Sequence, residues 1–445
     1  MHKKMEILAM NRFDPDQTAA LEPGVFRHIE RRAASFGASS VLFYAKPIEM
    51  VRAHGAYMFD AGGRRYLDLY NNVASVGHSH PVVVEAVSRQ LTVLNTNTRY
   101  LNEGIEAYSE ELLNTFPDQL SNLVMTCTGS EANDLALRIA QSNTNAKGFI
   151  VTRAAYHGNT AAVAEISPSA LRHRAPANHV KVIDAPDSRL ASNRDCALHF
   201  ERSVSAAIEE LNGSGVGFCA LIVDSIFSSD GIFSDPAGFL QIAVQKVQLA
   251  NGLFIADEVQ PGFGRTGDAM WGFMRHGVIP DIVTLGKPMG NGFPMGGVVT
   301  RPELLQKFCE ETGYFNTFAG SPVAAAAGSA VLKVLKDEGL LENAATVGTY
   351  LKQGLLNLKQ RSPRVGDIRG VGLFIGLDLI DPSNGAPDPT FAGLTINALK
   401  ENCILIGAAG SFGHTLKIRP PLCFSKEDAN VFLEALDMAL ALNDR

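Results

Sequence analysis

The chain has 445 residues, of which 46% are hydrophobic and 19% charged, so it can bury a large interior and is long enough for more than one domain. Its formal net charge is −7 and it contains no long basic run, which disfavours nucleic acid or an anionic membrane as a partner. The six cysteines are scattered and form no C-x-x-C pair, so a disulfide framework is not expected and a reducing, cytoplasmic location fits.

Residues 1–60 are predicted to form an N-terminal segment that packs with the C-terminal domain. The charged start is not followed by a long apolar stretch, so neither a signal peptide nor a transmembrane span is expected. Residues 40–44 have the side chains of a strand. Residues 57–64 predict a strand and a hairpin turn, because Gly62 and Gly63 can adopt the positive φ that such turns need.

Short apolar runs alternate with helical patterns through residues 61–328. Four runs are apolar at almost every position: 149–151, 220–223, 253–256 and 282–285. Such runs are typical of strands that helices cover on both faces. The segment 236–249 has helical spacing with a proline near its start, as expected for a helix between two strands. These patterns predict a large α/β domain with a mainly parallel sheet.

Residues 329–445 predict a small α+β C-terminal domain. An alanine-rich helix leads into residues 369–379, which have the pattern of a β-strand segment. The other predicted elements are a helix near 391–401, strands near 404–406 and 415–419, and a last helix from about 426.

Two residues at strand ends have the chemistry of a cofactor site. Asp257 closes the run 253–256, and α/β sheets bind ligands at the carboxyl ends of their strands. A buried carboxylate there needs a cation, although capping the next helix is the simpler role. Lys287 follows the run 282–285 among glycines. Desolvation would make its amine a nucleophile, although a solvated loop lysine is again the simpler interpretation.

The segment 128–133 follows an apolar run and opens a helix. Backbone N–H groups at a helix start, with the hydroxyls of Thr128 and Ser130, can hold a phosphate, although an ordinary N-cap has the same pattern. Tyr156 follows the run 149–151, where its ring could stack on a planar cofactor or pack in the core. A lysine, a carboxylate, a phosphate cradle and a flat ring are what pyridoxal 5′-phosphate (PLP) chemistry needs.

Taken together, these segments resemble the class III aminotransferases, which include the ω-transaminases and the ornithine and GABA aminotransferases. The resemblance runs from about residue 50 to the end and implies the PLP-dependent transferase fold type I. It is carried by G-S-E-A-N at 129–133, Y-H-G at 156–158, D-E-V-Q-x-G-F-G-R-T-G at 257–267, G-K-P-M-G-N-G at 286–292 and T-F-A-G-S-P at 317–322. These motifs, in this order, are very improbable by chance.

The resemblance implies roles for the residues around the cofactor ring. Lys287 would carry the cofactor as a Schiff base and later move the Cα proton. Asp257 would hold the pyridine nitrogen protonated, and Gln260 would approach the ring hydroxyl. His157 would line the pocket. The H-x-H at 78–80 has the spacing of metal ligands, but no third ligand cluster stands out and a similar motif occurs in this family, so no metal is expected.

The resemblance also implies how the cofactor phosphate is held. Gly129 and Ser130 would grip the phosphate, while Tyr156 stacks on the ring. Thr317 would reach the phosphate of the neighbouring subunit, which implies a homodimer with shared active sites.

Within this family the chain most resembles the phospholyases that act on phosphoethanolamine or 5-phosphohydroxylysine. The resembling stretches are 71–78, 94–101, 314–318 and 366–376. Many class III transaminases have an arginine three residues before a Pro-Pro pair, where it forks onto the substrate carboxylate. Lys417 occupies that place here, and Arg419 follows with the same strand facing and could substitute for it. Asp224 replaces the usual glutamate and could pair with Lys417.

The sequence therefore predicts a phospholyase that eliminates phosphate from a small phosphorylated amine such as O-phosphoethanolamine, giving an aldehyde, ammonia and phosphate. An aminotransferase of the ω- or alanine–glyoxylate type is the alternative, because both reactions share their first half. A non-catalytic PLP-fold binding protein is a third interpretation, which the presence of all the motif residues opposes. The candidate ligands of the substrate phosphate are Asn71, Asn72, Arg99, Lys417 and Arg419.

Overall fold

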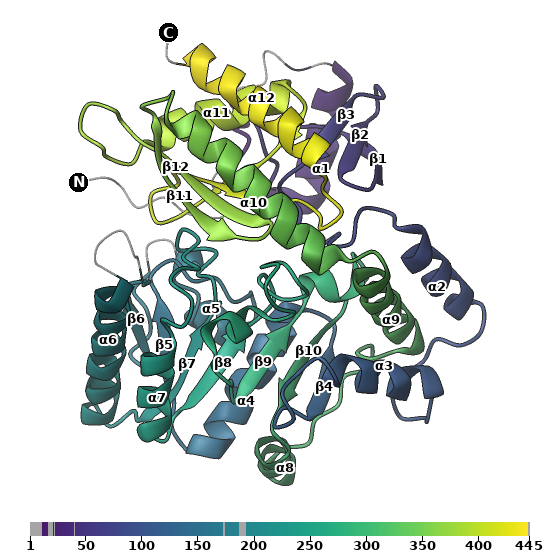
Figure 1. Ribbon diagram of the computed structural model, residues 1–445. Helices are drawn as coiled ribbons and strands as arrows, with labels where there is room; N and C mark the ends of the chain where they lie inside the picture. The colour runs from purple at the N-terminus through teal and green to yellow at the C-terminus, as the bar shows by residue number, and fades with distance from the viewer. Residues whose placement is uncertain are drawn as a thin grey trace.

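The apolar runs predicted as strands lie side by side in one seven-stranded sheet in the larger lobe (Figure 1). The computed structural model describes residues 11–16, 21, 23–39, 41–171, 174–186 and 193–443. The strand order is β4-β10-β9-β8-β7-β5-β6. The bounds are β4 Asn122–Thr126, β5 Gly148–Thr152, β6 Val180–Ile183, β7 Phe218–Val223, β8 Leu253–Asp257, β9 Ile282–Leu285 and β10 Gly296–Thr300. Strand β10 runs antiparallel to both β4 and β9, and the other neighbouring strands pair in parallel, so the expected mainly parallel sheet is confirmed.

Helices connect these strands and cover the sheet. Their bounds are α2 Pro81–Leu91, α3 Glu103–Leu113, α4 Gly129–Thr144, α5 Ala161–Glu165, α6 Asn193–Gly213, α7 Gln241–Leu249 and α8 Pro302–Glu311. Short 3₁₀ turns lie at Pro168–Ala170, Gly272–His276 and Lys287–Gly290. The helix predicted over 236–249 begins five residues later, at Gln241, because Gly238 has a φ of +87°, outside the helical region.

Alternate side chains of the central strands enter two different apolar cores, because successive residues of a strand point to opposite faces of the sheet. In β7, Leu221 and Val223 pack into one core together with residues of α6 and α7. Ala220 and Ile222 pack into the other core together with residues of α4. The strand is therefore apolar at consecutive positions, which is the pattern that made it visible in the sequence.

The N-terminal segment contributes helix α1 (Pro23–Phe36), a 3₁₀ turn (Gly37–Ser39) and most of a second sheet, β1-β2-β3-β13. The bounds are β1 Met50–His54, β2 Tyr57–Asp60, β3 Arg65–Asp68 and β13 Ile404–Leu405. The predicted hairpin at 57–64 is confirmed as β2 and its turn into β3. The predicted strand at 40–44 is wrong for the described residues 41–44: Phe43 makes a single bridge to Arg12, and Tyr44 has a φ of +68°, which ends the extended conformation.

The C-terminal part forms a third sheet in the order β11-β12-β15-β14. The bounds are β11 Val365–Val371, β12 Phe374–Leu379, β14 Gly407–Ala409 and β15 Thr415–Ile418, with helices α9 Pro322–Asp337, α10 Leu340–Lys359, α11 Pro389–Glu401 and α12 Lys426–Asn443. The single strand predicted over 369–379 is wrong, because Gly372, with a φ of +56°, turns the chain into a hairpin of two strands. The sequence did not indicate β14, whose Gly-Ala-Ala carries no β-branched or aromatic residue.

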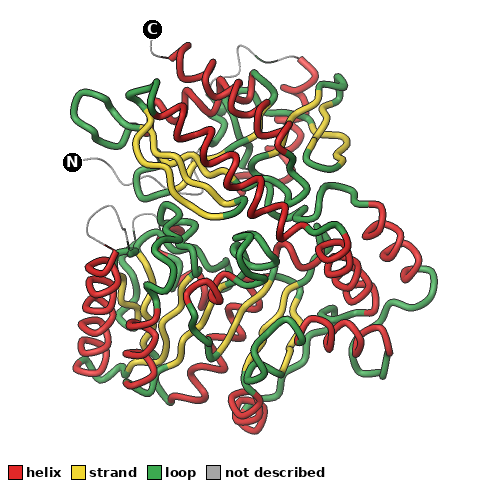
Figure 2. Tube along the Cα trace, viewed as in Figure 1, coloured by secondary structure: helices red, strands yellow, loops and turns green. Residues whose placement is uncertain are grey.

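Figure 2 shows the strands of the large sheet and those of the C-terminal sheet on opposite sides of a band of loops. Pairing of β13 with β3 joins the N-terminal segment to the C-terminal part, while domain boundaries at residues 60 and 328 stay predictions. Among the described residues, no helix combines the length and the apolar character that crossing a membrane requires. The cytoplasmic location stays a prediction.

Candidate active site

Asp257, the last residue of β8, lies 5% exposed at the edge of the large sheet that faces the loops. Its Oδ2 accepts a hydrogen bond from Asn133 Nδ2 at 3.0 Å and lies 2.7 Å from His157 Nδ1, and its Oδ1 accepts one from Val259 N at 3.1 Å. In the described chain no lysine or arginine forms an ion pair with it. Tyr156, the neighbour of His157, is partly buried, and burial raises its pKa. The carboxylate is thus fixed in place but has no permanent cation.

Lys287 reaches the same edge from the next strand. Thr284 in β9 pairs with Asp257 in β8, and Lys287 begins the turn three residues later. Burial lowers the pKa of the Lys287 amine, the nearby Asp257 carboxylate opposes that shift, and the Arg419 guanidinium adds to it. A lysine with a lowered pKa has a larger neutral fraction and is a better nucleophile.

The backbone of two loops, at Gly158 and Gly286, lies close to the start of α4. Thr128 is its N-cap, with its hydroxyl accepting a hydrogen bond from Glu131 N at 3.1 Å, and the first helical N–H groups have no acceptor within the helix. A Cβ added to Gly158 would lie 2.6 Å from Ser130 Oγ, and one added to Gly286 would lie 3.1 Å from Gly129 N. Glycine at these two positions lets the loops approach a helix N-terminus closely, and a helix N-terminus is a ready site for a phosphate.

Arg419 extends from the C-terminal lobe to the residue predicted to contact the cofactor hydroxyl. Its Nη1 donates to Gln260 Oε1 at 2.8 Å and to Asn72 Oδ1 at 3.2 Å. Gln260 Nε2 in turn donates to Ser228 Oγ at 2.7 Å. Burial lowers the pKa of Arg419, whose guanidinium lies 4.9 Å from the centroid of the Tyr70 ring. The structure therefore brings Gln260, Asn72 and Arg419 together as one cluster.

Lys417 lies in β15 with 7% of its surface exposed. Burial, reinforced by the Arg419 charge, holds the pKa of its amine well below the usual range. Its Nζ lies 5.4 Å from the centroid of the Phe374 ring. The ion pair considered with Asp224 does not form within 4.0 Å: the Asp224 carboxylate accepts instead from Ile226 N at 3.0 Å and Ser228 N at 3.1 Å. Asp224, which is shorter than the usual glutamate, is thus bound by backbone N–H groups of its own loop.

Three of the predicted site residues do not join this cluster by contacts within one chain. Asn71 donates through Nδ2 to Asp68 Oδ2 at 2.9 Å. Arg99 is exposed, with its guanidinium 4.1 Å from the centroid of the Phe315 ring. Thr317, on the loop after Phe315, is also exposed.

The two histidines of the H-x-H motif are held by different carboxylates. His78 Nε2 lies 2.8 Å from Asp68 Oδ2, and His80 Nε2 lies 3.0 Å from Glu338 Oε1. Within the described ranges no three metal-ligating side chains gather into a possible metal site.

Sequence reasoning did not select two side chains that the structure places at the centre of the site. Asn133 is the last residue of the G-S-E-A-N motif, and Thr284 lies inside an apparently apolar run. Both are buried, and Thr284 Oγ1 donates to Asn133 Oδ1 at 2.7 Å. The sequence signal that could have identified them is a polar residue within an otherwise apolar segment, because such a residue needs a polar partner when it is buried.

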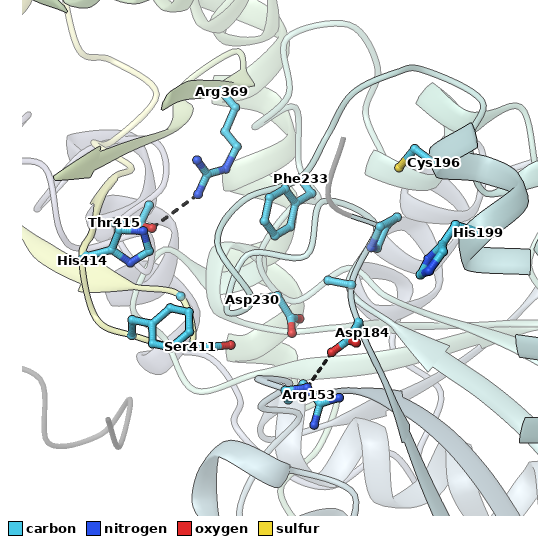
Figure 3. Close-up of a pocket in the computed structure, with 14 residues that line it drawn as sticks. Arg153, Asp184, Cys196, His199, Asp230, Phe233, Arg369, Ser411, His414 and Thr415 are labelled. Atoms are coloured by element: carbon cyan, nitrogen blue, oxygen red, sulfur yellow. Dashed lines mark hydrogen bonds and ion pairs between the residues drawn. The ribbon is translucent and has the colours of Figure 1, made fainter. Parts of the chain in front are cut away.

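A cavity of about 300 Å³ lies between the lobes, at the carboxyl ends of β5 and β6 (Figure 3). None of the predicted site residues lines it. Arg153 Nε bonds Asp184 Oδ1 at 2.6 Å on its rim, and Arg369 donates to both oxygens of Asp378 at 2.8 Å. Its polar wall is thus largely made of paired charges. Asp230 in this wall is close enough to the Lys287 cluster for its charge to raise the pKa of Lys417.

The fold and the geometry of this edge are those of a PLP enzyme: a lysine and a buried carboxylate at neighbouring strand ends face an open helix N-terminus. The chain belongs to the class III aminotransferases, whose family model matches residues 43–440.

The chain is similar to proteins with two different activities in their names. It is 37% identical over 447 residues to an alanine–glyoxylate aminotransferase 2-like protein of Drosophila melanogaster, covering 97% of this chain and 88% of the relative. It is 38% identical over 438 residues to ethanolamine-phosphate phospho-lyase homolog 1 of Caenorhabditis elegans, covering 94% of each. A solved Arthrobacter phospholyase in complex with phosphoethanolamine is 42% identical with a TM-score of 0.90, covering 93% of this chain and 99% of that one.

The protein is therefore an enzyme of this family with PLP as its cofactor, and its residues fit that group. The buried Asp257 carboxylate has no lysine or arginine partner within the described residues and can therefore pair with a protonated ring nitrogen. The glycine-walled start of α4 can take the phosphate, and Lys287 can take the aldehyde.

Proposed function

We propose that this enzyme is a phospholyase, which eliminates phosphate from a small phosphorylated amine such as O-phosphoethanolamine and forms an aldehyde, ammonia and phosphate. The observation that carries the proposal is the pair of buried cations, Lys417 and Arg419, beside the proposed cofactor lysine. Neither forms an ion pair within 4.0 Å in the part of the chain that the structure describes. Burial and the Arg419 charge lower the pKa of Lys417, and the carboxylates of Asp224 and Asp230 oppose that shift. Two adjacent buried cations are stabilised best by an anion with two charges, and a phosphate monoester has that charge.

Residues at the ends of the strands and at the start of α4 bind the cofactor in this proposal. Lys287 would hold the PLP aldehyde until the substrate amine takes its place and frees the lysine amine, and Asp257 would keep the pyridine nitrogen protonated. Gly129 and Ser130 bind the cofactor phosphate through backbone N–H groups at the start of α4, and Tyr156 lies against the ring. Gln260 and Thr317 complete the cofactor set. Bound PLP supplies an electron sink for the bonds broken at the substrate.

Residues of the site can serve two of the bond changes in the elimination, the loss of the Cα proton and the departure of the phosphate. The Lys287 amine removes the proton from the substrate Cα, for which its lowered pKa suits it because more of the amine is neutral. The Cβ–O bond breaks and the phosphate leaves with its electron pair. Lys417 and Arg419 stabilise that leaving charge in a buried site where electrostatic attraction is strong. Water hydrolyses the unsaturated amine that remains, giving aldehyde and ammonia.

The substrate phosphate is bound, in this proposal, by Lys417, Arg419 and Asn72. Asn72 is 3% exposed, and its Nδ2 and the Nε of Arg419 are buried without a hydrogen-bond partner among the residues that the structure describes. Such groups are costly to leave unsatisfied, so they favour a ligand with several acceptor oxygens. Asn71 is the weakest candidate, because Asp68 already accepts a hydrogen bond from its amide.

Arg99 and Thr317 act, in this proposal, in the active site of a second copy of the chain. Both are exposed, and large apolar side chains beside them are exposed too: Tyr100 is 68% exposed, Leu101 97% and Phe318 77%. An apolar patch of this kind marks an interaction surface. A homodimer would cover it and place an arginine and a threonine of each chain near the cofactor phosphate and substrate of the other.

An aminotransferase is the alternative, and the reach of Arg419 to Gln260 favours it. A guanidinium there could hold the carboxylate of an amino or keto acid by two parallel bonds. The reactions are separated by incubating the holoenzyme with O-phosphoethanolamine in the absence of a keto acid. The phospholyase releases phosphate and ammonia continuously, whereas dependence of turnover on added pyruvate would reject the proposal. The Lys287→Ala variant measures the uncatalysed background.

A further inference from the structure

Asn133 is a completely buried polar side chain in the first turns of α4, four residues after Gly129. That spacing places the two residues on one face of the helix. The face that meets the cofactor phosphate at its start therefore meets the sheet one turn later, at the ends of β8 and β9. The amide of Asn133 lies where these elements converge.

The hydrogen bonds of Asn133 connect α4 to the ends of β8 and β9. Its Nδ2 donates to Asp257 Oδ2 at 3.0 Å and to the backbone oxygen of His157 at 2.6 Å. Its Oδ1 accepts from Thr284 Oγ1 at 2.7 Å. The amide orientation is determined by these partners, because a flipped amide would direct its oxygen at a carboxylate and a carbonyl.

The hydrogen-bond partners of Asn133 either hold the cofactor in this proposal or lie next to residues that do. Asp257 ends β8, Thr284 lies three residues before Lys287, and His157 places its Nδ1 on the same Asp257 oxygen. The amide therefore connects the helix of the phosphate cradle, the carboxylate and the strand that leads to the lysine. It occupies Oδ2 together with His157, so Oδ1, which accepts from Val259 N, keeps acceptor capacity for the pyridine nitrogen.

We infer that Asn133 is a positioning residue, supported by Thr284, that keeps Asp257 aimed at the pyridine nitrogen and thereby sets cofactor affinity and the protonation of the bound cofactor. This inference rests on the proposed role of Asp257. A donated hydrogen bond favours the charged form of a carboxylate, and a charged Asp257 stabilises the protonated ring nitrogen. Groups that hold a catalytic carboxylate in place have this effect without touching the reacting atoms.

The alternative is that Asn133 only satisfies buried polar groups and stabilises the fold. The two roles differ in what they change. A structural role lowers the stability of the protein with and without cofactor alike. A positioning role changes the affinity for PLP and the pH at which the visible absorbance of the bound cofactor shifts.

The test measures PLP dissociation on dilution of the holoenzyme and the pH titration of its visible absorbance, for Asn133→Ala and for Asp257→Asn. Asn133→Ala should weaken PLP binding by about 10- to 100-fold, the loss expected when a hydrogen bond to a charged group is removed, and should shift the titration. The inference is overturned if Asn133→Ala keeps the affinity and titration of the wild type while Asp257→Asn loses them. An unchanged Asp257→Asn would instead reject the proposed role of Asp257, and this inference with it.

A matched pair at Thr284 gives the answer if Asn133→Ala does not fold. Thr284→Ser keeps the hydroxyl and should bind and titrate PLP as the wild type does. Thr284→Val keeps the shape but removes the donor to Asn133 Oδ1, and should shift both properties in the direction of Asn133→Ala by a smaller factor. Equal behaviour of the serine and valine variants would contradict the role of this hydrogen bond.

Discussion

The two ends of the candidate active site differ in how completely their polar groups are satisfied. At the cofactor end, Asp257 and Asn133 have hydrogen-bond partners on fixed elements of the large lobe, although Nε2 of the adjacent His157 is buried without a partner among the described residues. At the proposed substrate end, Asn72 Nδ2 and Arg419 Nε are buried without partners, and Lys417 and Arg419 have no ion pair among the described residues. The cofactor end is preorganised for a permanently bound cofactor, whereas the polar groups of the substrate end lack partners until an anionic substrate binds.

Removing Lys287, the proposed cofactor lysine, should have the largest effect. Lys287→Ala is expected to lower turnover by at least about 10²-fold, because general acid–base catalysis at Cα is lost. Borohydride reduction of the wild-type holoenzyme, followed by peptide mass spectrometry, should find the pyridoxyl group on Lys287. A label on a different lysine would disprove the assignment.

Neutralising the buried basic side chains should act chiefly on the substrate end, although Arg419 also donates to Gln260 of the proposed cofactor set. Lys417→Gln and Arg419→Gln are each expected to raise KM for O-phosphoethanolamine by about 10- to 150-fold, since a hydrogen bond to a charged group contributes about 1.5–3 kcal/mol. Lys333→Gln, an exposed lysine on α9, is the matched control and should leave KM unchanged. If both variants keep the wild-type KM, the phosphate subsite lies elsewhere.

Arg99→Gln should weaken substrate binding through the neighbouring subunit, by about 10-fold or more for one lost charged hydrogen bond. Mixing this variant with Lys287→Ala and allowing the subunits to exchange tests whether Arg99 acts in the active site of the other chain. In a mixed dimer, the Lys287→Ala chain would supply the missing arginine to the chain that keeps its lysine. Roughly a quarter of all sites should then recover normal KM, as expected for random pairing in a symmetric dimer. Absence of recovery in exchanged dimers would contradict a shared site.

The pH dependence of substrate binding should be a smaller effect. The pKa of Lys417 is lowered by burial and by Arg419, so Lys417 loses its proton, and with it its attraction for phosphate, at a lower pH than an ordinary lysine. KM for O-phosphoethanolamine should therefore rise as pH increases through that lowered pKa. In Lys417→Arg the charge persists at higher pH, and the rise should move to higher pH or vanish. Identical KM–pH profiles would exclude Lys417 as the titrating group.

The sequence predicted the parts of the fold whose residues are governed by local rules. The runs that became β5, β7, β8 and β9 are apolar because both faces of the strands are buried. The strand expected over 369–379 failed because the positive φ of Gly372, which makes the turn, cannot be read from composition. Tyr44 breaks the predicted early strand for a similar reason.

For the site, strand-end positions indicated Asp257 and Lys287, but the sequence alone could not show which side chains support them. Asn133 and Asp257 are 124 residues apart, and their contact depends on how α4 crosses the ends of β8 and β9. The same limit applies to Asp224, whose carboxylate turns to its own loop rather than to Lys417. Long-range contacts of this kind are set by tertiary packing and not by local pattern.

The central claim is that the enzyme eliminates phosphate and does not transfer the amino group. The most direct measurement is the form of the cofactor after prolonged incubation of the holoenzyme with excess O-phosphoethanolamine and no keto acid, read by absorbance and by mass spectrometry of the released cofactor. Elimination returns the cofactor as PLP after every turnover, so the account predicts PLP together with many equivalents of phosphate per site. Stoichiometric conversion to pyridoxamine phosphate, with no phosphate released from the substrate, would contradict it.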